Sequence, residues 1–291
     1  MLPDKRFVGL PKSFWAHVRT ISQDLGYTAR GTGQVCVHAP LEMARALRAL
    51  KLDSAHLHGP EGPTALGTQL HDYFQYRADV LNKYVEPRLL DAPAASKLFH
   101  GLHAKLTPKC PIPMNKQKGD KSGPNFLTGM VNMLVEANVG GLPVDYDPRE
   151  LTTVTRGGVP LRTLARRVDG CFPSAVNPIA VWEIKEYYYT TTFGSRVADG
   201  VYETLLDGME LEELREHEGI DVQHVLMVDS HYTWWECGRS YLCRIVDMLH
   251  MGYVDEVLFG AEVIERLPAL VREWVARHAQ RLKAASPAQS T

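Results

Sequence analysis

The residues that most constrain the fold of this chain are Asp169 and, after a short segment, the tripeptide Glu183-Ile184-Lys185. Between them the sequence predicts a short strand, a turn rich in Pro, Ser and Asn, and a second strand over residues 179–189. Strand side chains alternate between faces, so Glu183 and Lys185 point the same way, and a hairpin turn brings Asp169 beside them. The sequence therefore predicts two carboxylates and an ammonium on one patch of a buried sheet, where charges are costly unless they pair or hold a metal.

An alternative for these three charged residues is an exposed edge strand that carries a cross-strand salt bridge. The segments on either side of the charges argue against it, because Ile179-Ala-Val-Trp182 precedes them and Tyr187–Tyr189 follows them. Apolar and aromatic residues on both sides of a charged pair favour a buried strand.

The second half of the chain predicts alternating helices and strands. Helices are expected at 126–139, 195–206, 239–250 and 268–281, and strands at 223–229, at 254–259 and in a hairpin over 166–189. This order predicts an α/β fold with a mixed sheet flanked by helices. Residues 1–110 are predicted to be mainly helical, with a long helix over 66–85.

We expect three parts along the chain. Residues 1–124 form a mainly helical N-terminal region, which ends in a loop over 108–124 that is rich in proline, glycine and lysine. Residues 125–283 form the core that carries the charged hairpin. Residues 284–291 are expected to be a disordered tail.

Composition excludes several classes of protein. The formal net charge of −2 argues against a globally basic nucleic-acid binder, so any contact with phosphates must come from local patches. The five cysteines are scattered without a Cys-x-x-Cys pair, which favours reduced thiols and argues against a structural zinc site. We expect no secretory signal, no membrane association and a cytoplasmic location, because no apolar run approaches the length that spans a membrane.

The arrangement of Asp169 and Glu183-Ile184-Lys185, with a helix before and after it, resembles the PD-(D/E)xK nuclease superfamily, which has the restriction-endonuclease-like fold. The resemblance covers residues 126–260. It implies that Asp169 and Glu183 hold Mg²⁺, for which Mn²⁺ can substitute, and that Ile184 lends its backbone carbonyl to the metal. It also implies that Lys185 lies beside the attacking water.

Two further residues bear on this resemblance. Val168 stands where many members of the superfamily have proline. Glu136, on the helix before the hairpin, matches the place of a glutamate that often completes the metal site in the family. The alternative for Glu136 is a solvated glutamate near the end of a helix.

The chemistry of phosphodiester hydrolysis is compatible with these residue types. A carboxylate-bound Mg²⁺ neutralises charge on the phosphoryl oxygens and lowers the pKa of bound water. The catalytic set is then Asp169, Glu183 and Lys185. Lys185 can orient the water and stabilise the developing charge, and nearby cations would lower its pKa toward the range of a general base.

Basic residues near the motif are candidates for contacts with a nucleic-acid backbone. They are Arg156, Arg162, Arg166, Arg167, Lys116, Lys118 and Lys121. For any one of them the alternative is a solvated surface charge. The acidic stretch 207–221 is expected to face away from the nucleic acid.

Together these features predict a Mg²⁺-dependent DNA endonuclease that acts in restriction or antiphage defence, with DNA as its partner and a homodimer or a defence-system protein as a further partner. One alternative is a catalytically silent module of nuclease-like fold that binds nucleic acid or protein. Another is an RNase or exonuclease of the same fold.

Overall fold

A computed structural model of the protein describes residues 1–115, 123–189 and 194–285. Its central sheet has the strand order β5-β6-β7-β8, in which β5 is antiparallel to β6 and β6, β7 and β8 are parallel. The strands are β5 Gly170–Phe172, β6 Ala180–Glu186, β7 Gln223–Asp229 and β8 Glu256–Phe259. The predicted mixed α/β architecture is therefore confirmed.

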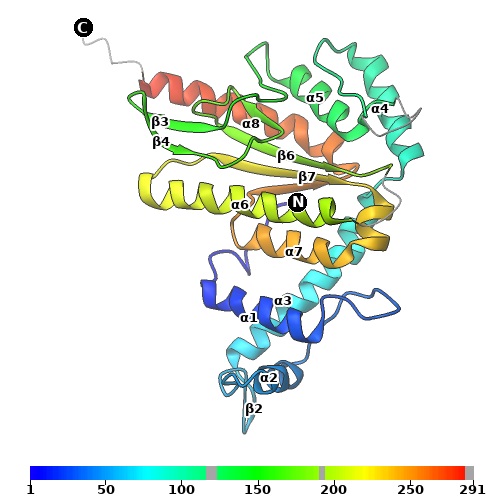
Figure 1. The fold of residues 1–291 in the computed structure, drawn as a ribbon, viewed down its shortest axis with the longest axis vertical. Helices are drawn as coiled ribbons and strands as arrows, with labels where there is room; N and C mark the ends of the chain where they lie inside the picture. Colours follow the sequence, from blue (N-terminus) through cyan, green and yellow to red (C-terminus); the bar gives the residue numbers. More distant parts are fainter. Residues whose placement is uncertain (116–122, 190–193, 286–291) are drawn as a thin grey trace.

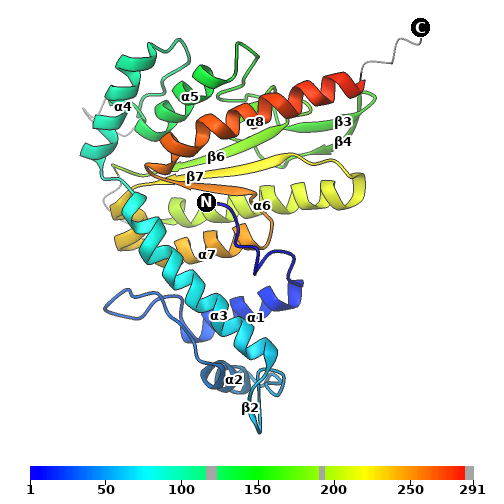
Figure 2. The same cartoon turned by 180° about the vertical axis from the view of Figure 1, so that it is seen from behind.

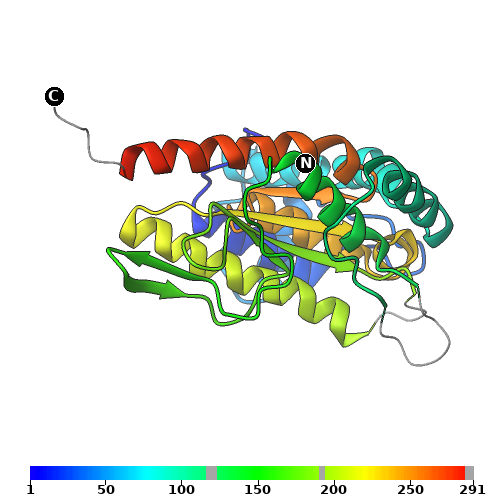
Figure 3. The ribbon, with the colours of Figure 1, turned by 90° about the horizontal axis from the view of Figure 1, so that it is seen from above.

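Helices cover both faces of this sheet (Figures 1 and 3). On one face lie α5 Phe126–Asn138 and α8 Glu262–Ala285, with α4 Ala92–Leu106 packed against α5. On the other face lie α6 Ser195–Glu218, which connects β6 to β7, and α7 Arg239–His250, which connects β7 to β8; a π-helical segment, η3 His231–Cys237, precedes α7. The crossover helices explain why β6, β7 and β8 run parallel.

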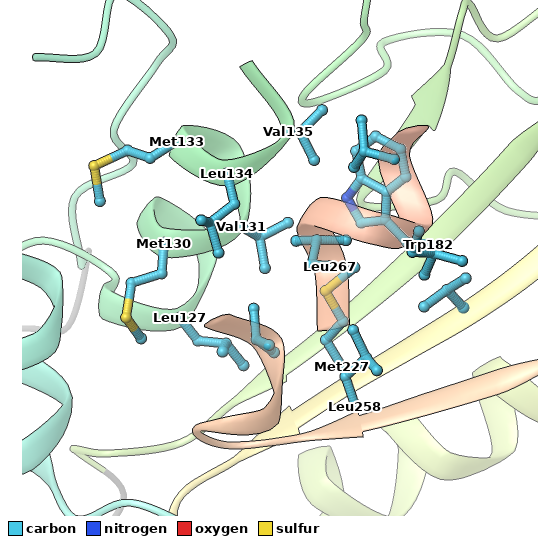
Figure 4. Packing of buried hydrophobic residues seen from close by; sticks show 14 of the residues in the cluster. Leu127, Met130, Val131, Met133, Leu134, Val135, Trp182, Met227, Leu258 and Leu267 are labelled. Atoms are coloured by element: carbon cyan, nitrogen blue, oxygen red, sulfur yellow. The ribbon is translucent and has the colours of Figure 1, made fainter. Parts of the chain in front are cut away.

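The core between the sheet, α5 and α8 is the largest apolar cluster near the charged strand (Figure 4). Leu127 of α5, Leu267 of α8 and Met227 of β7 are fully buried there. Trp182 of β6 stacks on Trp274 of α8 with ring centroids 5.4 Å apart. Burial of such side chains stabilises the fold by about 1.5–3 kcal/mol each, so this face fixes the position of β6.

The predicted hairpin forms with Gly170 opposite Trp182. The N–H of Asp169 donates to the carbonyl of Trp182 at 3.1 Å, which continues the ladder one residue beyond β5. A Cβ at Gly170 would lie 2.2 Å from the Trp182 ring, so only glycine allows this close pairing.

The N-terminal region is a separate group of helices beside α7 (Figures 1 and 2). It contains α1 Lys12–Leu25, α2 Pro40–Ala49 and α3 Ala65–Val80, with the short pair β1 His58–Gly59 and β2 Gly62–Pro63; the π-helical η1 Leu81–Val85 and the 3₁₀ turn η2 Glu86–Arg88 continue α3. These helices have an apolar cluster of their own around Phe14, Val18 and Tyr73. The buried Arg77 of α3 pairs with Asp247 of α7 at 3.1 Å and joins the two regions.

The structure differs from the sequence predictions at three elements. An additional hairpin, β3 Thr153–Arg156 with β4 Val159–Thr163, forms around Gly157-Gly158, whose positive φ angles suit a tight two-residue turn. Helix α6 continues past residue 206 to Glu218, and α8 begins at Glu262, before Pro268. Of the expected disordered tail, residues 284 and 285 end α8 and the remainder lies outside the described residues.

The expected boundary at residue 124 stays a prediction. Helix α4, which lies before it, packs on α5 in the same core as β6. No helix in the described part of the chain combines the length and the apolar composition that crossing a bilayer requires.

Two carboxylates lie at the carboxyl ends of the central strands. Asp229, the last residue of β7, is fully buried and accepts hydrogen bonds from the N–H of Leu90 at 2.7 Å and from the Tyr188 hydroxyl. Glu186, the last residue of β6, accepts from the N–H of Thr128 at 3.0 Å. Burial raises the pKa of Asp229 to about 7 despite these hydrogen bonds.

Substitution of Gly208 in α6 by alanine should destabilise the fold, because a Cβ there would lie 2.2 Å from the backbone oxygen of Tyr253. We expect a loss of about 1–3 kcal/mol in the free energy of unfolding, measured by urea denaturation. Gly101→Ala in α4 is the matched control: its Cβ would meet no atom within 4 Å, and we expect a gain of about 0.4–1 kcal/mol. Equal effects of the two substitutions would contradict this packing.

Asp229→Asn should change the pH dependence of stability. The folded pKa is raised, so the contribution of Asp229 to stability is complete below about pH 4 and is lost as the pH rises through about 7. The asparagine removes this loss, so the difference in unfolding free energy between variant and wild type should grow more positive from pH 4.5 to 7.5. Asp72→Asn, an exposed control, should show no such trend.

Candidate active site on strand β6

The three residues of the sequence motif converge in the structure. The Asp169 carboxylate accepts a hydrogen bond from the N–H of Ile184 at 2.7 Å, which places it against β6 between Glu183 and Lys185. The Lys185 ammonium donates to Glu183 Oε2 at 2.7 Å. The alternative of an exposed edge strand is wrong, because Glu183 is fully buried, Lys185 is 7% exposed and β7 pairs with the whole length of β6.

Glu183 and Lys185 project from the face of the sheet that α6 covers. Their strand neighbours Trp182 and Ile184 instead contact the α5–α8 core, as the alternation of a strand requires. Glu183 is fully buried and Lys185 is 7% exposed. A carboxylate in such a position needs cations or a metal to offset the loss of its hydration.

Helix α6 adds two carboxylates that the sequence analysis did not assign to the site. Glu203 Oε2 lies 3.4 Å from the Lys185 ammonium, and Asp207, one turn later, is fully buried. Gly200 allows this approach, since a Cβ there would lie 3.1 Å from the Lys185 side chain. Asp207, the first residue of the acidic stretch 207–221, thus belongs to the cluster, whereas the expectation that this stretch faces away from nucleic acid stays a prediction. The four-residue spacing of Glu203 and Asp207 was the available signal for their shared face.

Arg166 binds the carboxylates of the cluster together. Its Nη1 lies 2.6 Å from Asp207 Oδ2 and 2.9 Å from Glu183 Oε1, and its Nη2 lies 3.4 Å from Glu203 Oε2. The sequence analysis placed Arg166 among the contacts to nucleic acid. In the structure its guanidinium is directed at protein carboxylates, and its side chain is 23% exposed.

The two carboxylates of the motif have pKa values that are shifted in opposite directions. Burial and the charge of Glu183 raise the pKa of Asp169 to about 6. Burial acts in the same direction on Glu183, but Lys185 and Arg166 outweigh it and hold the pKa of Glu183 below its usual value. Two neighbouring carboxylates thus have different affinities for protons, as in many catalytic sites.

The pKa of Lys185 moves opposite to the expected direction. Burial lowers it, but the carboxylates of Glu183 and Asp169 together outweigh burial and hold the pKa above its usual value. The prediction that nearby cations lower the pKa is wrong here, since Arg166 is outweighed by the carboxylates.

The donor atoms of the cluster suit a hard divalent cation. Glu183 Oε1 and Asp207 Oδ1 are buried oxygens without a hydrogen bond; the 2.9 Å approach of Arg166 to Glu183 Oε1 is an ion pair that lacks hydrogen-bond alignment. Mg²⁺ needs only one or two carboxylates because it keeps several waters. In the described residues no group of three or more His, Cys, Asp or Glu side chains is arranged to hold a metal, and the metal-ligand roles of Asp169, Glu183 and the Ile184 carbonyl stay predictions.

The structure does not bring Glu136 to this cluster. Glu136 lies on α5, which covers the opposite face of the sheet, and its carboxylate accepts a hydrogen bond from the N–H of Lys109 at 2.9 Å. The charge of Glu136 also helps to raise the pKa of the buried Cys110 thiol, after the larger effect of burial. Its role as a metal ligand has no support from this position.

The other basic residues that the sequence predicts to contact nucleic acid differ in their ion pairs and exposure. Arg156 pairs with Glu218 at 3.0 Å, and Arg162 pairs with Glu213. Arg167 is exposed and has no ion pair within the described ranges. Lys116, Lys118 and Lys121 lie outside the described residues.

Two family models match the chain. A domain of unknown function, DUF7687, matches residues 90–274, which include the whole β6 cluster. The chain belongs to the DUF7687 family. A second domain of unknown function, DUF7690, matches residues 1–84, the helical N-terminal region. No curated protein and no solved structure matches the chain.

Arg166→Gln should destabilise the protein, because it leaves Glu183 and Asp207 buried without their shared cation. We expect a loss on the order of 3 kcal/mol in the free energy of unfolding, measured by urea denaturation. Arg156→Gln is the matched control, since its partner Glu218 is 32% exposed, and we expect a change below about 1 kcal/mol. Similar losses in the two variants would mean that Arg166 does not hold the cluster together.

Proposed function

We propose that the protein is a Mg²⁺-dependent endonuclease with a restriction-endonuclease-like core. The observation that carries the proposal is the convergence of Asp169, Glu183 and Lys185 on one face of a buried central strand. Glu183 is ion-paired to Arg166 and Lys185, while Asp207 Oδ1 of the same cluster is a buried oxygen without a hydrogen bond. A buried carboxylate oxygen left in this way is suited to binding a metal.

The order of elements around the cluster also supports the proposal. Helix α5 precedes an antiparallel pair, β5 and β6, and α6 then leads to β7, which is parallel to β6. This succession of helix, hairpin, helix and strand is what the sequence resemblance to PD-(D/E)xK nucleases leads us to expect.

Each residue of the cluster has a role in this chemistry. The bound Mg²⁺ would supply a water of lowered pKa and neutralise charge on the phosphoryl group. Asp169 and Glu183 would hold the ion, with the Ile184 carbonyl. Lys185, whose raised pKa keeps it protonated, would orient the water and donate hydrogen bonds to the developing charge on the phosphate. Arg166, at the partly exposed edge of the cluster, would pair with a phosphate oxygen.

We propose DNA as the substrate, in restriction or antiphage defence. Arg167 lies beside Arg166 and is exposed, so its side chain can contact the backbone that leads to the site. A homodimer would present two such sites to a two-fold symmetric DNA sequence.

A silent binding module is the second candidate, and one observation favours it. Lys185 and Arg166 already neutralise Glu183 within the protein, so the cluster can be stable without a metal. In this case the same fold would bind nucleic acid or a partner protein without cutting it.

Incubation of supercoiled plasmid with the protein and Mg²⁺ should give nicked or linear DNA, and EDTA should prevent this. Glu183→Gln should abolish cutting, because the amide keeps the shape of the side chain but loses the charge that holds the ion. Lys185→Met should slow cutting by about 10²–10⁴-fold. Glu216→Gln, an exposed carboxylate on α6, is the control and should cut like the wild type.

Circular dichroism and urea unfolding must first show that the variants are folded, since both substituted residues are buried. Cutting that is equal in all variants would indicate another site. Binding of DNA without Mg²⁺-dependent cutting would favour the silent module. Cutting of RNA but not DNA would favour the RNase alternative, and degradation of DNA only from linear ends would favour the exonuclease alternative.

A further inference from the structure

A second site lies where the N-terminal helices meet α6 and α7. A pocket of about 700 Å³ is lined by Arg19 of α1 and Tyr27 from the DUF7690 part, and by Tyr202 of α6 and Arg244 of α7 from the DUF7687 part. Figure 1 shows α1, α7 and α6 one above another at this junction. Small-molecule sites have volumes of about 300–1,000 Å³ and often lie between domains.

The charges that line the pocket favour an anion. Neither Arg19 nor Arg244 has a carboxylate within ion-pair distance in the described part of the chain. Asp247, which also lines the pocket, is held by the buried Arg77 at 3.1 Å. Asp24 is exposed and bridges to neither arginine. Both arginines therefore line the pocket without a carboxylate partner in the described part of the chain. Arg19 donates from Nη2 to the sulfur of Met251 at 3.6 Å, and Arg244 donates from Nη1 to the Tyr202 hydroxyl at 3.3 Å. Guanidinium groups bind phosphate in a bidentate manner.

The remaining lining suits a planar ring. Tyr202, which lines the pocket, is 50% exposed, and Val201 and Leu205 of the same helix supply apolar surface. The Arg244 guanidinium lies 4.8 Å from the centre of the Tyr27 ring and donates to the Tyr202 hydroxyl at 3.3 Å. Tyrosine rings and arginine planes are the groups on which nucleobases stack.

We propose that this pocket binds a nucleotide, with the base against Tyr202 and the apolar residues of α6 and the phosphate against Arg19 and Arg244. The site is separate from the β6 cluster, and it does not depend on the proposed nuclease activity. The two sites share α6, because Val201 and Tyr202 line the pocket while Glu203 and Asp207 face Lys185 and Arg166. A ligand in the pocket therefore contacts the helix that completes the cluster.

Isothermal titration calorimetry of the full chain tests the site, with AMP, GMP, CMP and UMP as probes and with the matching nucleosides and inorganic phosphate as comparisons. The buffer contains EDTA, so that binding through a metal at the β6 cluster does not contribute. We expect at least one monophosphate to bind about tenfold or more tightly than both its nucleoside and phosphate.

Arg19→Gln and Arg244→Gln should each weaken this binding about tenfold, whereas Arg45→Gln, on the exposed side of α2, should leave it unchanged. Arg19 is exposed, so its substitution does not threaten folding. Glu216→Gln, at an exposed carboxylate of α6 that does not line the pocket, should bind like the wild type. The proposal is overturned if no monophosphate exceeds its nucleoside and phosphate, or if Arg19→Gln and Arg45→Gln bind equally.

Discussion

The rest of this structure depends on the ion cluster around one fully buried carboxylate. Glu183 lies in the middle of the central sheet, where an unpaired charge would cost several kcal/mol. Lys185 from the same strand and Arg166 from the preceding loop offset that cost. Both cations also contact Glu203 on α6, so the requirement to neutralise one strand residue fixes the helix above it.

Helix α6 is held by close packing as well as by charge. Gly200 lets it approach the Lys185 side chain, and Gly208 lets it lie against the backbone of Tyr253. Its other side, at Tyr202, faces the N-terminal helices. The helix therefore contacts three parts of the molecule: the central sheet, α7 and the N-terminal region. If both proposed sites are real, α6 is the element that they share.

The same electrostatics connect stability with the proposed chemistry. The cluster brings together Glu183, Asp169 and Asp207, and the positive charges of Arg166 and Lys185 stabilise it in the metal-free protein. Asp169 and Glu183 would hold a divalent ion, which would supply part of this positive charge, and Arg166 would be the residue to pair with a phosphate. Neighbouring charged groups that shift each other's pKa values in this way are common at catalytic sites.

The sequence alone determined most of the local elements around the motif and the face that each β6 side chain takes, because these follow from short-range periodicity; it missed the β3–β4 hairpin and the full lengths of α6 and α8. The hairpin that joins Asp169 to Glu183 and Lys185 is confirmed for that reason. Only the tertiary structure decided which distant residues meet them. Arg166 enters the cluster, and Glu136 lies across the sheet, because the helix that covers a given face is set by how whole elements pack and not by any neighbouring residue.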